Sequence, residues 1–401
     1  MRRYHAAWIL PISEPPIRDG WIAIDGGRIV ALGDRKTASS ADVDLGQVAV
    51  MPGLVNAHTH LELSYLRDSV PAAATFVQWV RGVMAARRQQ PDSRAPEILE
   101  AIDRSIGEAV ECGTAVVGDI SNTLVTFAPL VRSPLAAAVF YELIRFNTAD
   151  PTGVVERACQ EIQALEATDR VRVSLAAHAP YSVAPLVLRA IRQAVARDSV
   201  RPCSVHLAES VEEIEFLRTA AGPCRELLEE VGAWDPAWTA PAVSPVEYLD
   251  ASGFLGARTL AVHGVQMTRA DLGRLVARGT TLVTCPRSNR HTGAGVPPIE
   301  EFYDSGVRVA VGTDSLASAP DLNVFTELAV LRTLAPSVPA SALLESATRV
   351  GARALGFDAE YGTIQPGKRA RLLAVDVPSG SSDVEEDLVA GIQSGQIRWI
   401  E

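Results

Sequence analysis

Two histidines spaced two residues apart, His58 and His60, are the first residues of this sequence to suggest chemistry. They end an apolar run that begins at Leu54 and is typical of a buried strand. Side chains at positions i and i+2 of an extended strand point to the same side, so both imidazoles can converge on one ion. We therefore predict a metal site at the end of this strand.

Four further side chains that can bind a metal or orient a water follow or end later predicted strands, namely His178, His206, His263 and Asp314. Three neutral imidazoles and a carboxylate suit zinc or ferrous iron and leave room for a water. The metal would lower the pKa of that water to about 7. Asp314 can bind the metal and accept the water proton, and His263 can orient the hydroxide without being a ligand. Glu209, three residues beyond His206, is placed to pass a proton to a substrate.

The elements that must position these residues alternate regularly through the middle of the chain. Apolar, β-branched runs alternate with longer stretches of helical periodicity. The predicted strands lie near residues 54–58, 115–119, 136–141, 171–177, 204–207, 259–263, 281–284 and 307–311. Eight such repeats predict an α/β fold of the (β/α)8 TIM barrel type, whose strand ends meet at one mouth. A doubly wound open sheet is the rival, but no Gly-x-Gly-x-x-Gly follows the first strand.

The two ends of the chain have a different pattern, rich in short strands and turns. Residues 20–33 alternate apolar and polar residues around a Gly-Gly turn, and residues 362–376 are similarly divided by turns. We predict a small β-sandwich domain built from residues 1–53 and 362–401, and a barrel domain of residues 54–361.

Composition limits the classes of partner. The formal net charge of −11 argues against binding to nucleic acid or anionic lipid. No apolar stretch has the length of a membrane-spanning helix, and the apolar run of residues 6–12 lacks a cleavage signal, so we expect a cytoplasmic protein acting on a small molecule. The long segment from Arg218 to Asp250 is expected either to shape the pocket or to form an interface.

Taken in chain order, the motifs resemble the amidohydrolase superfamily, and specifically its mononuclear cytosine deaminase-like branch. The matching segments are Met51-Pro52-Gly53-Leu54-Val55-Asn56, His58-Thr59-His60, His206…Glu209, His263, Asp314 and Gly362-Thr363-Ile364-Gln365-Pro366-Gly367-Lys368. The resemblance implies four metal ligands, namely His58, His60, His206 and Asp314. It also implies that His263 lies beside the bound water and that Glu209 is the proton shuttle.

The positions of the lysines indicate how many metal ions the site holds. Binuclear relatives in this superfamily bridge two metals with a modified lysine. The two lysines of this sequence, Lys36 and Lys368, lie outside the predicted barrel strands. We therefore expect one divalent ion, zinc, with iron as the alternative.

Three local motifs resemble those of aminodeoxyfutalosine deaminases, which act on an adenine nucleoside in the futalosine route to menaquinone. They are His60-Leu61-Glu62-Leu63-Ser64, His178-Ala179-Pro180-Tyr181-Ser182 and Cys285-Pro286-Arg287-Ser288-Asn289. The reaction that this implies is attack of metal-bound hydroxide on the ring carbon that carries the amino group, followed by loss of ammonia.

A substrate of this kind predicts contacts to the base, the ribose and a carboxylate. The candidate contacts are His178 for the nucleoside, Glu62 for the ribose, Arg287 or Arg145 for the carboxylate, and Ser288 and Asn289 from the same loop. The alternatives are a structural ion pair for Arg287, support of the histidine pair or of its loop for Glu62, and shaping of the loop after the seventh strand for Ser288 and Asn289. The same metal ligands would serve a deaminase of adenosine, S-adenosylhomocysteine, guanine or cytosine, or a triazine chlorohydrolase. A non-catalytic binding protein is disfavoured because Glu209 and Asp314 are both present. Barrel enzymes of this type often pair, so a homodimer is a further expectation.

Overall fold

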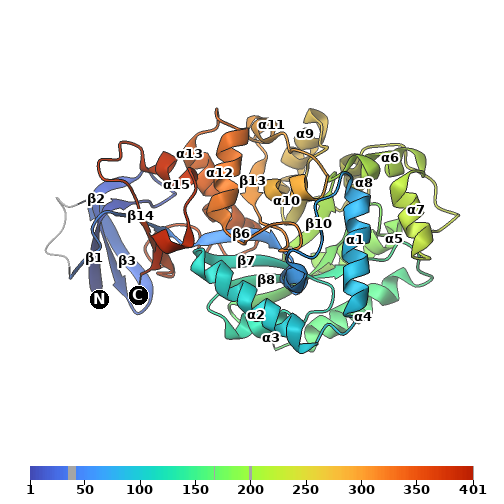
Figure 1. Ribbon diagram of the computed structural model, residues 1–401, viewed down its shortest axis with the longest axis horizontal. Helices are drawn as coiled ribbons and strands as arrows, with labels where there is room; N and C mark the ends of the chain where they lie inside the picture. The colour runs from blue at the N-terminus through green and yellow to red at the C-terminus, as the bar shows by residue number, and fades with distance from the viewer. Residues whose placement is uncertain (35–41, 167, 198–200, 401) are drawn as a thin grey trace.

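The computed structural model describes residues 1–34, 42–166, 168–197 and 201–400, so Lys36 lies outside the described residues. Figure 1 shows a barrel surrounded by helices, with a smaller sheet at one end that carries both termini of the chain. No described helix is both long and apolar enough to cross a membrane.

Among the described residues, eight parallel strands form the barrel sheet, and they follow one another in chain order. They are β6 (Leu54–Thr59), β7 (Thr114–Ser121), β8 (Ala136–Leu143), β9 (Val171–Ala177), β10 (Cys203–Leu207), β11 (Thr259–His263), β12 (Thr281–Thr284) and β13 (Arg308–Val311). Almost every residue on these strands is buried, as expected when helices cover the outside of a barrel and side chains fill its interior. The predicted strands are all present at their predicted positions.

Hydrogen bonds across the seam between β6 and the end of β13 bring the first and last strands together. The Asn56 side chain donates to Thr313 Oγ1 (2.7 Å) and accepts from the Thr313 backbone N–H (3.1 Å). The backbone N–H of Asp314 donates to the carbonyl of His58 at 3.0 Å. A Cβ at Gly312 would lie 2.7 Å from the same carbonyl, so only glycine permits this approach. The seam therefore places Asp314 beside the histidine pair.

Helices cover the outside of the barrel, and local signals start many of them. Their bounds are α1 (Phe76–Gln89), α2 (Pro96–Glu111), α3 (Phe127–Arg132), α4 (Pro151–Gln163), α5 (Pro185–Ala196), α6 (Val211–Thr219), α7 (Pro223–Glu230), α8 (Pro245–Ala251), α9 (Arg269–Arg278), α10 (Pro286–His291), α11 (Ile299–Asp304), α12 (Val324–Leu334), α13 (Ala340–Glu345), α14 (Gly351–Ala354) and α15 (Val384–Val389). Short 3-10 helices span Leu61–Leu66 and Ser394–Gln396, and a π-helix spans Ser346–Val350. Thr268 and Asp271 form a capping box at the start of α9, and proline opens several of the others.

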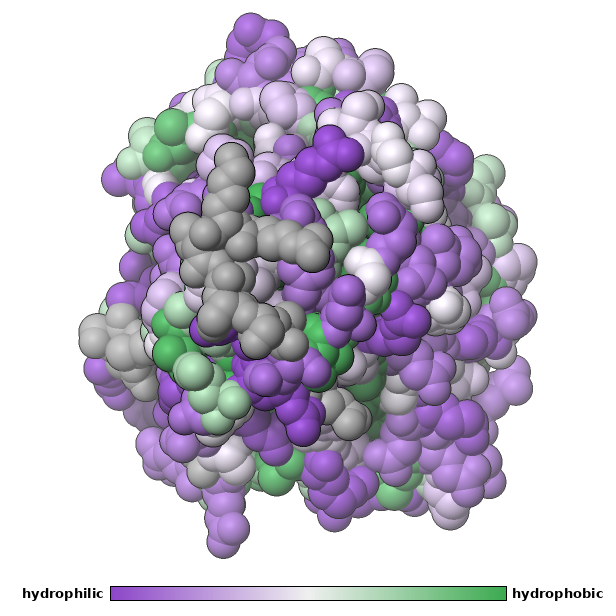
Figure 2. Space-filling view, turned by 90° about the vertical axis from the view of Figure 1, so that its left-hand side faces the viewer, coloured by the Kyte–Doolittle hydropathy of each residue, from purple (hydrophilic) through white to green (hydrophobic). Residues whose placement is uncertain are grey.

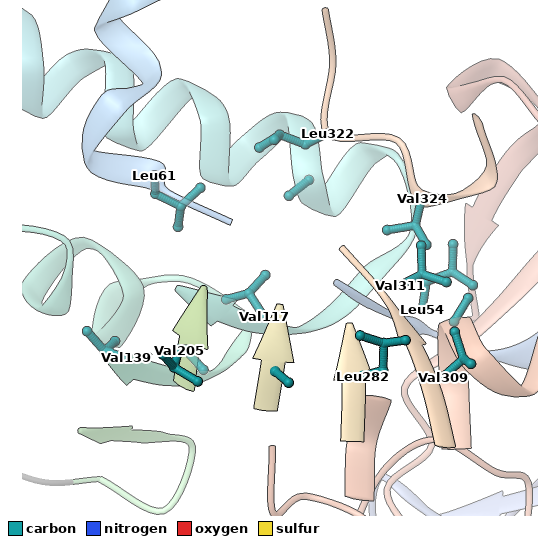
Figure 3. Packing of buried hydrophobic residues seen from close by; sticks show 14 of the residues in the cluster. Leu54, Leu61, Val117, Val139, Val205, Leu282, Val309, Val311, Leu322 and Val324 are labelled. Atoms are coloured by element: carbon teal, nitrogen blue, oxygen red, sulfur yellow. The ribbon is translucent and has the colours of Figure 1, made fainter. Parts of the chain in front are cut away.

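One hydrophobic core joins the barrel strands to the surrounding helices. In Figure 3, Val324 at the start of α12 lies beside Val311 of β13 and Leu54 of β6. The same cluster contains Met51 and Leu373, which belong to the small sheet. The barrel and the small sheet therefore share one buried interior.

The small sheet is drawn from both ends of the chain. Its strands are β1 (Arg2–Ile9), β2 (Ile17–Asp25), β3 (Arg28–Asp34), β4 (Val43–Asp44), β5 (Val48–Pro52), β14 (Leu372–Asp376) and β15 (Ile397–Trp399). In the part of the chain that the structure describes, they hydrogen-bond in one mixed sheet of order β15-β14-β5-β1-β2-β3, with β4 beside β1. The predicted fold class is confirmed, with a single continuous sheet in the small domain. The domain limits near residues 53 and 362 stay predictions.

Figure 2 views the molecule from the end that carries the small sheet. Hydrophilic residues dominate this face, and hydrophobic residues appear only in small separate groups. Among the described residues seen in this view, the end of the molecule that carries the small sheet thus shows no large apolar surface.

Candidate active site

The predicted histidines converge at the carboxyl ends of the barrel strands. Ring nitrogens of His58, His60 and His206 lie within 4.8 Å of one another, and a second set with the same spacing contains His58, His263 and Asp314. All of these side chains are buried or nearly so. Burial among neighbouring imidazoles lowers the pKa of His58 well below its usual value, so the ring is neutral and can bind a metal.

The residues present fit a divalent metal ion. Both ring nitrogens of His58 are shielded from solvent and have no hydrogen-bond partner among the described residues. A buried imidazole without any partner costs free energy that a coordinated ion would recover. His60 Nε2 lies 3.5 Å from Asp314 Oδ1 and 3.4 Å from His206 Nε2, so several donor atoms face one point. Imidazole nitrogen and carboxylate oxygen together are the ligands that zinc and ferrous iron prefer.

Asp314 is held in position by its own loop. Its backbone has a φ of +61°, a left-handed conformation that a non-glycine residue adopts only when its surroundings require it. Ser315 N–H donates to Oδ1 at 2.8 Å, and Ser288 Oγ donates to Oδ2 at 2.5 Å. Burial alone would raise the pKa of Asp314, but the nearby imidazoles and the Ser288 hydrogen bond outweigh it, so the pKa is lowered and the group is ionised.

His206 is oriented by groups behind it. Its Nδ1 lies 2.9 Å from the carbonyl oxygen of His178 and 3.3 Å from Glu142 Oε1. A partner at Nδ1 leaves Nε2 directed toward the other ligands, which is the usual way in which a metal-binding imidazole is held. Burial lowers the pKa of His206, but the hydrogen bond and charge of Glu142 prevail and raise it to about 9.

Glu209 and His263 form a proton-transfer pair beside the cluster. Glu209 Oε2 lies 3.6 Å from His263 Nε2. Asn289 Nδ2 lies 2.9 Å from His263 Nδ1, and by donating there it leaves the ring proton on the nitrogen that faces Glu209. Burial raises the pKa of Glu209 well above its usual value and lowers the pKa of His263 to about 3. These shifts favour the protonated form of Glu209 and the neutral form of His263.

These groups lie on the floor of a cavity of about 270 Å³. Five predicted ligands or proton carriers line it, namely His60, His206, His263, Glu209 and Asp314, and so does one predicted substrate contact, His178. Burial lowers the pKa of His178 to about 4, so this ring too is neutral. The cavity is of the size and position expected for a small-molecule site at the mouth of a barrel.

Both arginines predicted to meet a substrate carboxylate lie outside this cavity, so that part of the prediction needs correction. The guanidinium of Arg287 is bound by Glu327 Oε1 (2.6 Å) and Asp321 Oδ1 (2.8 Å). Glu327 lies on α12 and Asp321 lies on the loop before α12. These two carboxylates occupy the N–H donors of the Arg287 guanidinium, so few donors remain for a substrate. Arg145 is exposed and donates to the carbonyl of Ile144.

The other three predicted substrate contacts support the site from behind. Glu62 accepts hydrogen bonds from Ser121 Oγ (2.6 Å) and the Asn122 backbone N–H (3.0 Å), so it organises the loop after β7. Ser288 and Asn289 reach Asp314 and His263 as described above. Their roles are to position the metal cluster, because α10 carries them behind it.

Three polar groups that line the cavity were missed by the sequence analysis. Asn122 Nδ2 donates to Glu142 Oε2 at 2.8 Å, and Arg87 Nη1 donates to Asn122 Oδ1 at 3.0 Å. Glu142 is the last residue but one of β8, so the rule that strand ends face the mouth would have found it. Arg87 comes from the last turn of α1, where a partly exposed arginine carries no sequence signal.

The fold and the site together define a barrel hydrolase that uses a divalent metal. The chain belongs to the amidohydrolase family, whose sequence model matches residues 49–398. The family predicted from the order of the motifs is therefore confirmed, and with it the assignment of the chain as a hydrolase.

Comparisons with individual proteins agree with this assignment. The chain is 30% identical over 355 residues to an aminodeoxyfutalosine deaminase of Deinococcus radiodurans, covering 84% of this chain and 81% of the relative. It is 30% identical over 380 residues to a 5-methylthioadenosine/S-adenosylhomocysteine deaminase of Nitratidesulfovibrio vulgaris (90% and 80%). A crystal structure of an adenosine deaminase from Xanthomonas campestris with bound zinc superposes with a TM-score of 0.81 at 26% identity, covering 98% of this chain and 90% of that one.

Proposed function

We propose that this hydrolase acts on carbon–nitrogen bonds in cyclic amidines, as a deaminase of adenine-type nucleosides, with zinc as its metal and aminodeoxyfutalosine as its substrate. The observation that carries the proposal is the position of the buried Glu209 carboxyl group, whose Oε2 lies 3.6 Å from His263 Nε2 beside the metal cluster. Burial raises the pKa of this carboxyl group, which favours its protonated form. Deamination of an aromatic ring needs such an acid, because both the ring nitrogen and the leaving amine must be protonated.

Each side chain has a defined part in this reaction. When bound by His58, His60, His206 and Asp314, the metal supplies the Lewis acidity that activates a water at neutral pH. Asp314 Oδ1, which faces the histidines, accepts a proton from that water. Glu209 Oε2 gives its proton to the ring nitrogen beside the carbon under attack, and His263 stabilises the charge that develops on the added oxygen.

The reaction closes with a second proton transfer. The carbon that carried the amino group now bears oxygen and nitrogen, and its bond to nitrogen breaks as the carbon–oxygen double bond forms. The proton taken from water passes to the leaving amine, so that one water is consumed and one ammonia is released. As the carbon–oxygen double bond forms, the hydroxyl proton of the added oxygen passes to Glu209, which lines the cavity, and this restores the Glu209 acid.

The choice of substrate rests on the relatives. Deaminases of aminodeoxyfutalosine and of 5-methylthioadenosine or S-adenosylhomocysteine are equally similar to this chain, at 30% identity. All of these substrates are adenine nucleosides with a substituent at the 5′ carbon. The second candidate function is therefore deamination of methylthioadenosine, and the position of His178 in the cavity suits the nucleoside in either case.

The test is ammonia release by zinc-loaded protein from a panel of compounds. The panel contains aminodeoxyfutalosine, methylthioadenosine, S-adenosylhomocysteine, adenosine, guanine, cytosine and a chlorotriazine. We expect the adenine nucleosides to be deaminated, with the highest kcat/KM for aminodeoxyfutalosine. Chloride release alone, or ammonia from guanine or cytosine alone, would contradict the proposal.

A further inference from the structure

Side chains of two kinds line different parts of the cavity. The charged and imidazole groups come from the ends of barrel strands and the loops that follow them. The apolar groups come mainly from two helices, α1 and α7, which Figure 1 shows at the end of the molecule away from the small sheet. We call this second part the α1–α7 chamber, and its lining residues are Phe76, Trp79, Val80, Val83, Met84, Leu227, Leu228 and Val231.

The two walls of the chamber pack on each other. Phe76, Leu227 and Leu228 belong to one hydrophobic cluster, and Val80 and Met84 pack against it. Arg81 on α1 and Glu230 on α7 join the helices through two hydrogen bonds, from Nε (3.0 Å) and Nη2 (2.6 Å). The chamber is therefore a built feature of the fold, with the segment after residue 218 covering the mouth of the barrel.

The charges around the cavity are distributed unevenly. Its acidic lining residues, Glu142, Glu209 and Asp314, all lie on the side of the barrel strands. Among the described residues that line the cavity, Arg87 is the one arginine or lysine, and it is bound to Asn122 and lies 3.5 Å from Glu62. A positively charged group placed in the chamber would lose its water and find no carboxylate there.

We propose that the α1–α7 chamber binds the 5′ substituent of the nucleoside and disfavours substituents that carry an ammonium group, so that a thioether is preferred to an α-amino acid. This inference rests on the proposed function, because it assumes that the adenine ring lies at the metal cluster with the 5′ carbon directed away from the strand ends. S-adenosylhomocysteine, whose 5′ substituent ends in an α-amino acid, is the substrate that the chamber disfavours.

The test compares kcat/KM for ammonia release from methylthioadenosine, S-adenosylhomocysteine and adenosine by the zinc-loaded enzyme. We expect methylthioadenosine to exceed S-adenosylhomocysteine by about tenfold or more, because the ammonium must be desolvated. Equal values for these two compounds would overturn the inference while leaving the proposed function in place. No ammonia from any of the three, or from aminodeoxyfutalosine, would overturn the proposed function and this inference together.

A pair of variants tests the chamber itself. Met84→Glu introduces a carboxylate into the apolar wall, and Met84→Gln introduces a side chain of the same size without the charge. We expect Met84→Glu to raise the ratio of kcat/KM for S-adenosylhomocysteine to that for methylthioadenosine severalfold, and Met84→Gln to leave the ratio close to that of the wild type. An equal change in both variants would show that the chamber does not contact the 5′ substituent.

Discussion

Glu209 combines two properties that rarely occur in one carboxyl group at neutral pH, complete burial and the lack of a counter-charge strong enough to ionise it. Burial raises its pKa, and the nearby carboxylate of Asp314 raises it further, although His206 acts in the opposite direction. In the proposed mechanism Glu209 is therefore the proton donor next to the position of the metal. Asp314, whose pKa is lowered, is the proposed acceptor, and the two carboxyl groups differ in this way because their surroundings differ.

Replacing Glu209 by Gln keeps the size of the side chain and removes the proton that it transfers. We expect kcat for ammonia release to fall by about 10²- to 10⁴-fold, with the zinc content unchanged, as measured by metal analysis of the purified variant. Glu215→Gln, on the exposed face of α6, is the matched control and should retain wild-type activity. Undiminished activity in Glu209→Gln would remove this residue from the mechanism.

Asp119 is a second buried carboxyl group, and it affects stability. It accepts hydrogen bonds from the Leu61 backbone N–H (2.8 Å) and from Thr126 Oγ1 (2.6 Å), and burial raises its pKa from 3.8 to about 8. Between these pH values the folded state keeps a proton that the unfolded state has lost. The contribution of Asp119 to stability is therefore present at low pH and is lost as the pH rises toward 8.

Asp119→Asn tests this dependence because asparagine is neutral throughout. We expect the thermal midpoint of the wild type to fall relative to that of the variant as the pH rises from about 5 to 8. The corresponding loss of unfolding free energy is about 1 kcal/mol per pH unit. Parallel midpoints for the two proteins across this range would show that Asp119 is ionised in the folded state.

At the scale of secondary structure, α1 and α7 are the elements that convert a barrel mouth into a closed cavity. Their apolar faces form the chamber, while Arg81, Glu226 and Glu230 lie on the outside. Exposed ion pairs contribute little to overall stability. We therefore expect the bidentate pair between Arg81 and Glu230 to set the distance between α1 and α7 and to contribute little to the free energy of unfolding.

Charge-reversal variants of Arg81 and Glu230 separate the effect on helix spacing from the effect on overall stability. We expect Arg81→Glu and Glu230→Arg each to raise KM for methylthioadenosine severalfold, because loss of the pair lets α1 and α7 separate at the chamber. KM for adenosine should change little, since it has no 5′ substituent to reach the chamber. The double variant with both charges exchanged should recover most of the loss, and steady-state kinetics with the two substrates would show whether it does.

At the scale of the whole molecule, closure of the barrel and assembly of the metal site are one event. The backbone N–H of Asp314 donates to the carbonyl of His58, and both residues face the metal position. A metal bound there would tie the first strand of the barrel to the last. The homodimer expected from the sequence stays a prediction at this scale.

Removing the metal should therefore lower global stability as well as activity. We expect a chelator to lower the thermal midpoint by several degrees. An ion that binds only the folded state raises the free energy of unfolding, and this gain grows with the logarithm of the ratio of the free ion concentration to Kd. Added zinc should restore both the midpoint and the activity. His58→Ala should have the low midpoint in either condition, and a midpoint of the wild type that does not respond to the chelator would contradict the coupling.

The strands, the barrel and the family could be read from the sequence because they depend on local patterns. Leu54–Thr59 and its seven counterparts are short apolar runs between helical stretches, and each chemical residue follows or ends one of them. Ser288 and Asn289 contact Asp314 and His263, and whether they also touch a substrate stays a prediction. Whether such a side chain reaches a substrate or a neighbouring ligand depends on the orientation of α10, which no local pattern specifies.

The sequence alone determined the number of strands, the order of the metal-binding residues along the chain and the side of the barrel on which they meet. Hydrophobic periodicity and the position of a residue at the end of a strand depend on neighbouring residues, so both can be recognised in the sequence without knowledge of the fold. Only the tertiary structure decided that Arg287 is held by Glu327 and Asp321, that Arg87 and Glu142 line the cavity, and that α1 and α7 close it. These facts depend on contacts between residues tens to more than a hundred positions apart, whose energies are set by three-dimensional packing.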